Sequence, residues 1–324
     1  MSIIERIADL LGSVPETHRK PSTAVERAAD TLELNRIERG ASDMSRRFDF
    51  PEGTDLAAES RARPARPPRT TTQTLRIDLD QLRRQSIITP GGERTPIAES
   101  FRLIKRQILA YLANPKAGVP ANLVMVTSAL AGEGKTFCTI NLAISIALEM
   151  DRTVLLVDAD VAKPSVPQML GFEAKKGLMD LLLDRGIDLA EVLCKTNIDK
   201  LTVLPAGTAH QNATELLASD AMRMLLREMA ARYRDRIIIF DSPPLLAASE
   251  AGVLASQIGQ IVIVVEAGKT TEAVLKDALG RIETNNVTGL LLNKAEGAGL
   301  RYFYGGYGYG GYGYAERAKA RSDA

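Results

Sequence analysis

Short apolar runs alternate with amphipathic stretches over most of the chain from about residue 90 onward. Six runs rich in Val, Ile and Leu predict buried strands at 123–127, 153–158, 201–204, 237–241, 261–266 and 287–293. Stretches with helical spacing lie before the first strand, at 96–113, and between later strands, notably at 136–150, 221–231 and 271–284. Nearly continuous apolar strands that alternate with helices are typical of a parallel sheet covered on both faces. The pattern therefore predicts an α/β fold with a mostly parallel sheet between two layers of helices.

The two ends of the chain do not follow this pattern. Ser2 and Glu5 can form a capping box for a short amphipathic helix, and residues 61–69 are rich in Pro and Arg. Such a composition cannot bury a core. We expect residues 1–85 to comprise that helix and a disordered Pro/Arg-rich linker, residues 86–300 to form the folded domain, and residues 301–324 to form a flexible Tyr/Gly-rich tail.

Composition and charge narrow the classes of protein. The 41 Lys and Arg residues balance 40 Asp and Glu residues, which gives no global attraction to nucleic acid. The two cysteines, Cys138 and Cys194, form neither a CxxC pair nor a disulfide framework. No apolar run approaches the roughly 20 residues that span a bilayer, and charges interrupt the apolar N-terminus where a signal peptide would need none. We therefore expect a cytoplasmic protein without a nucleic-acid partner.

The first predicted strand runs into a small-residue loop that ends in Gly134-Lys135-Thr136, and a predicted helix follows. This is the sequence setting of a phosphate-binding P-loop, with Ala129 in place of the usual first glycine. Loop amides and the helix N-terminus can bind phosphate oxygens, the lysine can reach the β- and γ-phosphates, and the threonine can ligate Mg²⁺. Asn293, at the end of the last strand, is a candidate for adenine contact. The predicted nucleotide-binding residues are Ala131, Gly132, Glu133, Gly134, Lys135, Thr136, Phe137 and Asn293.

Two further strands end in aspartates. Asp158 and Asp160 follow the second strand, and Asp241 ends the fourth, just before Ser242-Pro-Pro244. Ligands of open α/β sheets bind at the carboxyl ends of the strands, so these carboxylates can converge on the P-loop. The alternative is that each aspartate caps the loop after its strand. With a P-loop in the same sheet, we favour a Mg²⁺ site formed by Thr136, Asp158 and Asp241.

Six tyrosines lie among glycines near the C-terminus, namely Tyr302, Tyr304, Tyr307, Tyr309, Tyr312 and Tyr314. Such a segment loses much backbone entropy on ordering and has few aliphatic partners, so each phenol would be presented on a flexible tether. One interpretation is a self-associating low-complexity tract. The other is a phosphoryl-acceptor segment that can enter an ATP site.

Taken together, these pieces resemble the bacterial tyrosine autokinases of exopolysaccharide and capsule synthesis, the BY-kinases. The matching motifs are the P-loop 129–136, Asp158-Ala-Asp160, Asp241-Ser-Pro-Pro244 and the tyrosine-rich C-terminus. The resemblance covers about residues 90–316. It implies that Lys135 and Thr136 handle the phosphates and Mg²⁺, that the aspartates complete the metal site, and that Asp160 activates the acceptor tyrosine. The predicted catalytic residues are Lys135, Asp158, Asp160 and Asp241.

Three departures from the family pattern affect these expectations. Ala162 and Lys163 stand where the family usually has arginines, so positive charge is kept only in part. A motif tied in the family to ring-shaped oligomers reads Glu99, Arg102 and Lys105, with lysine in the last position. The membrane-spanning activator that some members carry in the same chain is not part of this sequence. The resemblance then implies a separate transmembrane partner of the chain-length type and recruitment to the inner face of the membrane.

The predicted function is ATP-dependent autophosphorylation of the tyrosine cluster in trans, in a homo-oligomer that a protein-tyrosine phosphatase would reset. Two other hypotheses remain. One is a switch ATPase similar to the cell-division-positioning and chromosome-partitioning ATPases. Leu130 argues against it, because that branch carries a signature lysine at this position. The other is a scaffold that uses nucleotide only to order a docking surface.

Overall fold

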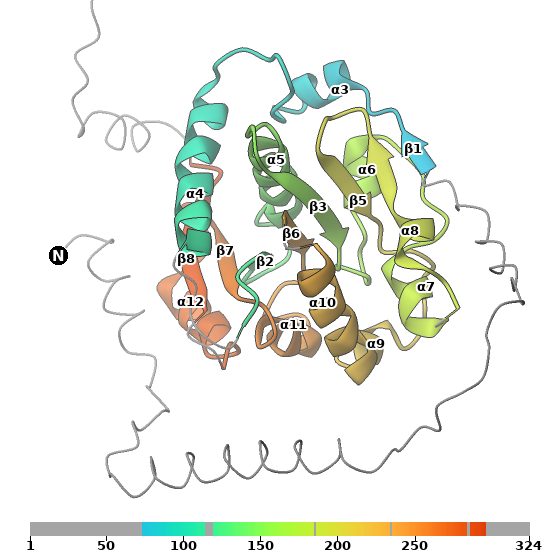
Figure 1. Cartoon of the computed structure of the whole chain (residues 1–324). Helices are drawn as coiled ribbons and strands as arrows, with labels where there is room; N and C mark the ends of the chain where they lie inside the picture. Colours follow the sequence, from blue (N-terminus) through green and yellow to red (C-terminus); the bar gives the residue numbers. More distant parts are fainter. Residues whose placement is uncertain (1–72, 114–118, 185, 234, 284–285, 296–324) are drawn as a thin grey trace, which may run out of the picture. The chain divides into compact units, whose positions relative to one another are not determined.

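The computed structural model describes residues 73–113, 119–184, 186–233, 235–283 and 286–295 (Figure 1). All of them belong to one compact unit, Thr70–Ala324. The expectations for the N-terminal helix, for the linker up to residue 72 and for the six tail tyrosines lie outside the described residues. Within the described residues, no helix is both long and apolar enough to cross a membrane.

The described strands form one eight-stranded sheet in the order β1-β4-β5-β3-β6-β2-β7-β8. Its six predicted strands are β2 (Leu123–Ser128), β3 (Thr153–Asp158), β5 (Leu201–Leu204), β6 (Arg236–Asp241), β7 (Gln260–Glu266) and β8 (Val287–Asn293). These six pair in parallel, as expected. Two short strands were not predicted, β1 (Gln73–Leu75) and β4 (Cys194–Thr196), and β4 pairs with β5 in the antiparallel sense. The central strands β3, β6 and β2 place three carboxyl ends side by side.

Helices cover both faces of the sheet (Figure 1). One core lies under α3 (Leu79–Arg84), α4 (Pro96–Ala113), α5 (Lys135–Ala147) and α6 (Val166–Leu170). The other lies under α7 (Leu178–Leu183), α8 (Leu189–Val192), α9 (Ala213–Leu217), α10 (Asp220–Arg232), α11 (Ser249–Ala255) and α12 (Glu272–Leu279). Strand residues alternate between the cores, so Val124 and Val126 of β2 face α5 whereas Leu123 and Met125 face the opposite layer. Both faces are apolar, which is why the strands show no polar alternation.

The folded domain begins earlier than the sequence predicted. Residues 73–85, which we expected to be linker, form β1 and α3. Leu75, Ile77 and Leu82 are buried in the core under α4 and α5. The side chain of Asn197 accepts a hydrogen bond from the Ile77 amide at 2.8 Å and donates one to its carbonyl at 3.0 Å. Three apolar residues in a polar stretch are too few to show a period, so this edge of the domain was missed.

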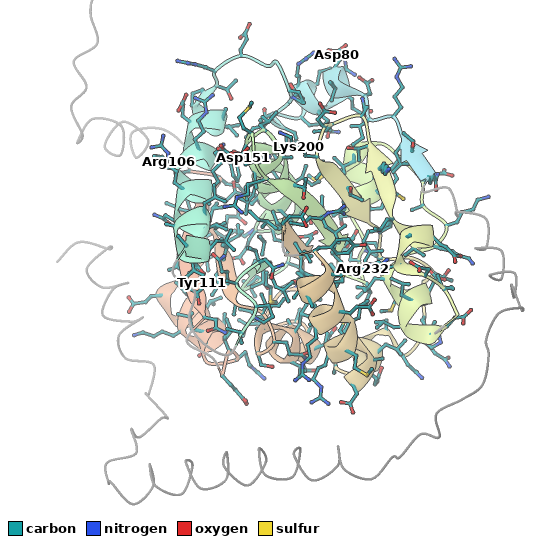
Figure 2. All side chains as sticks on the ribbon, viewed as in Figure 1. Asp80, Arg106, Tyr111, Asp151, Lys200 and Arg232 are labelled. Carbon is teal, nitrogen blue, oxygen red and sulfur yellow. The ribbon has the colours of Figure 1, made fainter. Side chains whose placement is uncertain are left out.

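Two long helices end earlier than their patterns suggested. We predicted helices over 136–150 and 271–284, whereas α5 ends at Ala147 and α12 ends at Leu279. Beyond α5, the ammonium of Lys200 donates to the carbonyls of Glu149 and Met150 at 2.8 and 2.9 Å. Lys200 lies close to Asp151 in Figure 2. A lysine from a distant loop thus satisfies carbonyls that the helix leaves free, which no local pattern reveals.

Candidate active site

The P-loop connects the end of β2 at Ser128 to the start of α5 at Lys135. Gly132 and Gly134 have φ of 87° and 93°, in the left-handed region that favours glycine. At Gly134 a Cβ atom would also lie 2.1 Å from the Nδ2 of Asn293. Ala129, in the usual place of the first glycine, is fully buried and accepts a hydrogen bond from the Leu246 amide at 3.2 Å. Two positions of the loop therefore need glycine for their backbone conformation, and Ala129 is accommodated in the core.

Glu133 shapes the loop from inside. Its side chain is buried, and its Oε2 accepts a hydrogen bond from the Leu130 amide at 2.8 Å. Its Oε1 accepts one from the Thr270 hydroxyl, which lies in the loop after β7. The Glu133 carboxylate is thus a structural brace, and only its backbone remains a candidate for phosphate binding. Leu130, where the switch ATPases carry their lysine, is 41% exposed and contributes no charge.

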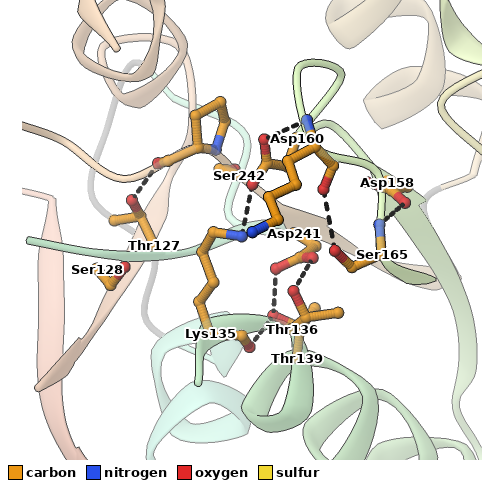
Figure 3. A network of polar contacts seen from close by, with 12 residues as sticks. Thr127, Ser128, Lys135, Thr136, Thr139, Asp158, Asp160, Ser165, Asp241 and Ser242 are labelled. Atoms are coloured by element: carbon orange, nitrogen blue, oxygen red, sulfur yellow. Dashed lines mark hydrogen bonds and ion pairs between the residues drawn. The ribbon is translucent and has the colours of Figure 1, made fainter. Parts of the chain in front are cut away.

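Lys135 forms an ion pair with Asp160, with 2.6 Å between Nζ and Oδ2, and both side chains are almost fully buried (Figure 3). Burial works to lower the pKa of Lys135. The negative charge of Asp241, the hydrogen bond to Asp160 and the charge of Asp158 outweigh it, so the pKa is raised. Lys135 therefore stays an ammonium ion at the head of the helix. Its carboxylate partner, Asp160, holds the ammonium in place through a charge-assisted hydrogen bond.

Asp241 is the last residue of β6, and its carboxylate contacts the P-loop helix α5. Its Oδ2 accepts a hydrogen bond from the Thr136 hydroxyl at 2.7 Å, and its Oδ1 accepts one from Thr139 at 3.1 Å (Figure 3). Burial raises the pKa of Asp241 to about 6, although the charge of Lys135 and the Thr136 hydrogen bond oppose the shift. The loop after it is anchored to β2, because Thr127 donates to the Pro243 carbonyl at 2.7 Å. These contacts fix the carboxylate against Thr136 in the first turn of α5.

Asp158 pairs in register with Asp241 on the adjacent strand. Its Oδ2 accepts hydrogen bonds from the amides of Ser165 and Val166, both at 3.1 Å, so it does cap the loop before α6. Its Oδ1 is buried and has no hydrogen-bond partner among the described residues. Burial, together with the charge of Asp241, raises the pKa of Asp158 to about 7. The capping interpretation therefore accounts for one oxygen, and the other remains available.

These donors fit Mg²⁺. Within the described residues, no three His, Cys, Asp or Glu side chains form a metal cage by themselves. Two carboxylates and one hydroxyl remain, which suits an ion that takes one or two carboxylates and completes its shell with phosphate and water. The unpartnered Oδ1 of Asp158 and the crowded charges of Asp158 and Asp241 are the features that a cation would relieve.

Other predicted residues lie away from this cluster. Phe137 packs against the core under α4 and α5. Asn293 adjoins the P-loop, but its Nδ2 donates to the Glu133 carbonyl at 2.9 Å. Glu99 and Arg102 pair with each other on the surface of α4. Lys105 is only 9% exposed, pairs with Glu149 and donates to the Ser145 carbonyl, so this side chain joins α4 to α5.

Three residues of the site were missed by sequence reasoning. Thr139 faces Asp241 because it lies one helical turn after Thr136, which its spacing could have indicated. Ser165 and Thr270 contact Asp158 and Glu133 from other loops, and for these two neither residue type nor spacing indicates the contact. Lys294, which follows Asn293 at the end of the last predicted strand, contacts the Gly132 carbonyl of the P-loop.

Comparison with known proteins places this geometry in a family. The AAA domain family matches residues 121–286. The chain is 36% identical over 173 residues to the tyrosine-protein kinase YwqD of Bacillus subtilis, which covers 52% of this chain and 71% of YwqD. It is 30% identical over 213 residues to the tyrosine-protein kinase wzc of Salmonella typhi, which covers 65% of this chain. It is 33% identical over 224 residues to the succinoglycan biosynthesis transport protein ExoP of Rhizobium meliloti, which covers 68% of this chain. The chain spans only 28% of wzc and of ExoP.

Two solved structures are similar to this chain in fold. The chimerical protein CapA2B2 is 25% identical, with a TM-score of 0.57 over 69% of this chain and 93% of that one. The kinase domain of the Escherichia coli tyrosine kinase ETK is 25% identical, with a TM-score of 0.55 over 74% of this chain and 94% of that one. The expected fold class, a mostly parallel sheet covered by helices on both faces, is confirmed.

Proposed function

The chain belongs to the bacterial tyrosine kinases, and we propose that it transfers the γ-phosphoryl group of ATP to tyrosines in the C-terminal segment of a second copy of itself. The observation that carries the proposal is the buried Lys135–Asp160 pair beside Thr136, Asp241 and Asp158 at the carboxyl ends of β3 and β6. The relatives named tyrosine-protein kinases support the same reaction.

The P-loop would bind ATP. Its amides and the N-terminus of α5 would hold the β- and γ-phosphates, and the Lys135 ammonium would move from sharing charge with Asp160 alone to sharing it with the γ-phosphate. Thr136, Asp158 and Asp241 would hold Mg²⁺, which when bound neutralises charge on the phosphates. Because phosphoryl transfer depends mainly on positioning and electrostatics, these buried charges supply most of what the reaction needs.

Asp160 would position the acceptor tyrosine. Its Oδ2 faces Lys135, and its Oδ1 accepts a hydrogen bond from the Lys163 amide at 3.2 Å. When Lys135 turns to the phosphates, an Asp160 oxygen becomes free to accept the hydrogen bond of an incoming phenol. The proton of the tyrosine hydroxyl would pass to this carboxylate as the phenol oxygen bonds to the γ-phosphorus, while the bond from that phosphorus to the β,γ-bridging oxygen breaks and ADP leaves.

The acceptors we propose are the six tyrosines of residues 302–314, presented in trans. Each phosphotyrosine adds about −1.5 to −2 charges, so full modification would add roughly −9 to −12 to one segment. Repulsion on that scale would separate subunits, which makes assembly depend on the phosphorylation state. Glu99 and Arg102 on the surface of α4 are the residues we propose for contact between copies, because Lys105 is already engaged within the chain.

The biological process we propose is control of exopolysaccharide polymerisation and export. The name of ExoP, a succinoglycan biosynthesis transport protein, supports it. A transmembrane partner of the chain-length type would activate the kinase and hold it at the inner face of the membrane, and a protein-tyrosine phosphatase would reverse the modification.

A mixing experiment tests transfer in trans. A Lys135→Met chain with its tail intact is incubated with Mg²⁺, radiolabelled ATP and a wild-type chain cut after residue 300, which carries the site but no acceptor. The proposal predicts labelled tyrosine on the Lys135→Met chain only when both proteins are present. The control replaces the cut wild-type chain with a Lys163→Met chain cut at the same residue. It should behave as the cut wild-type chain does, because Lys163 contacts Asp160 only through its backbone amide. ATP hydrolysis without any labelled tyrosine would favour the switch ATPase instead.

A further inference from the structure

We propose that Asn293 and Lys294, at the end of β8, are positioning residues that hold two consecutive peptide groups of the P-loop in the orientation needed to bind phosphate. This inference rests on the proposed function only in taking the P-loop as the site of a nucleotide's phosphates. It assigns the two residues to the loop backbone, whereas the sequence suggested adenine contact for Asn293.

The contacts are direct and sequential. Lys294 Nζ donates to the Gly132 carbonyl at 2.7 Å, and Asn293 Nδ2 donates to the Glu133 carbonyl at 2.9 Å. Residues 160 and 162 positions away in the sequence thus bind neighbouring carbonyls of one loop. A single such contact is ordinary, but two in register on adjacent peptide groups fix the orientation of a short stretch of backbone.

Peptide geometry turns these contacts into an effect on phosphate. In a planar trans peptide group, the carbonyl of one residue and the amide of the next point in opposite directions. Holding the Gly132 carbonyl toward β8 therefore aims the Glu133 amide away from β8, and holding the Glu133 carbonyl does the same for the Gly134 amide. Neither amide has a hydrogen-bond acceptor among the described residues. Successive amides aimed into one space form an anion-binding concavity.

The local backbone supports a specific role for both residues. Lys294 has φ of 56°, in the left-handed region, which is uncommon for a residue with a side chain. Such conformations persist where surrounding contacts require them. Asn293 approaches the loop so closely that a Cβ on Gly134 would meet its Nδ2 at 2.1 Å. The glycine is therefore needed for its own φ and also to admit the asparagine amide.

A matched lysine is available as a control. Lys294 and Lys269 each lie 3.3 Å from Oε2 of Glu266, and both are largely exposed. Only Lys294 also contacts the P-loop. Removing either charge changes the electrostatics near Glu266 in a similar way, so a difference between the two variants reports the contact with the Gly132 carbonyl.

The experiment measures nucleotide affinity in the full chain. Kd values for ADP and AMP are determined by competition with a fluorescent ADP analogue in Mg²⁺, for wild type, Lys294→Met, Lys269→Met and Lys294→Arg. Because a charge-assisted hydrogen bond that orients the loop is lost, Lys294→Met should weaken ADP binding about tenfold or more. AMP, which lacks the β-phosphate that P-loop amides bind, should lose less than about threefold. Lys294→Arg keeps a donor and should retain most of the ADP affinity.

Several results would overturn the inference. Equal losses for ADP and AMP would place Lys294 on the base or ribose. Equal losses of ADP affinity in Lys294→Met and Lys269→Met would mean that the loss comes from the removed positive charge and not from the contact with the Gly132 carbonyl. A Lys294→Met chain that has lost the wild-type circular dichroism is replaced in the comparison by Asn293→Ala, which should show the same ADP-selective loss. If the wild type does not bind ADP, the proposed function is wrong, and this inference is wrong with it.

Discussion

The effect of Asp158→Asn on the free energy of unfolding of the nucleotide-free protein should depend on pH. It should become more favourable to the variant as the pH rises. The carboxylate of Asp158 is buried against Asp241, and one of its oxygens has no hydrogen-bond partner among the described residues. Asp158→Asn keeps the size of the side chain and can keep an acceptor for the Ser165 and Val166 amides. It removes the charge, which is the feature that a cation would otherwise neutralise.

The magnitude follows from the pKa shift. The pKa of Asp158 rises from 3.8 to about 7 in the folded protein. An acid whose pKa is raised by folding stabilises the fold fully below its unfolded pKa, and that contribution is lost as pH rises through its folded pKa. The shift of roughly three pKa units corresponds to about 4 kcal/mol between pH 3 and pH 8, at about 1.4 kcal/mol per unit. Between pH 5 and pH 8 the loss amounts to about 2–3 kcal/mol, because part has already occurred at pH 5.

The assay is urea unfolding of wild type and Asp158→Asn at pH 5 and pH 8, in EDTA and without nucleotide. The free energy of unfolding of Asp158→Asn minus that of the wild type should increase by about 2–3 kcal/mol from pH 5 to pH 8. Asp180→Asn is the control. Burial works to raise the pKa of Asp180, but hydrogen bonds from Thr208 and Gly177 outweigh it and lower the pKa. Asp180 is therefore charged at both pH values, and the difference in free energy of unfolding between Asp180→Asn and the wild type should stay constant. A pH-independent difference for Asp158→Asn, or a shift in favour of the wild type, would refute the reasoning.

Three other changes test separate parts of the account. Gly134→Ala should weaken ADP binding at least tenfold in a fluorescence titration, because alanine resists the required φ of 93° and its Cβ has no room; unchanged affinity would contradict the loop geometry. Ile108→Ala should lower the free energy of unfolding by about 2–5 kcal/mol, whereas Leu103→Ala on the exposed side of the same helix should change it by less than about 0.5 kcal/mol; similar losses would mean that α4 is not docked as described. The Cys138 thiol, whose pKa burial raises to about 12, should react with iodoacetamide at pH 8 only after unfolding, and the buried Cys194 should behave alike; rapid labelling of the folded protein would contradict their burial.

The sequence predicted the central part of the fold because its strands are buried on both faces. Leu123–Ser128 and Arg236–Asp241 each contain an unbroken run of apolar residues, Leu-Val-Met-Val and Ile-Ile-Ile-Phe, which leaves little ambiguity about burial. The edge of the sheet was missed for the opposite reason. Gln73–Leu75 and Cys194–Thr196 have three residues each, and their positions depend on contacts such as that of Asn197 with Ile77. A strand of this length carries no period, so only tertiary contacts define it.

The candidate site divides in the same way. Lys135, Thr136, Asp160 and Asp241 converge as expected, because a P-loop and the ends of adjacent parallel strands constrain where they can lie. Lys294, in contrast, reaches the P-loop from a strand end more than 160 positions away. A lysine beside an asparagine has many possible roles, so its contact with the Gly132 carbonyl could be found only from the structure.

The central claim is that the P-loop of this chain drives phosphorylation of its own tyrosines. The most direct measurement is phosphopeptide mass spectrometry on residues 301–324, from native cells that carry wild type or Lys135→Met as the sole copy, with equal protein levels confirmed. The account predicts phosphotyrosine among positions 302–314 in the wild type and none in Lys135→Met. Phosphotyrosine that persists in Lys135→Met would mean that another kinase modifies the segment, and would contradict the account.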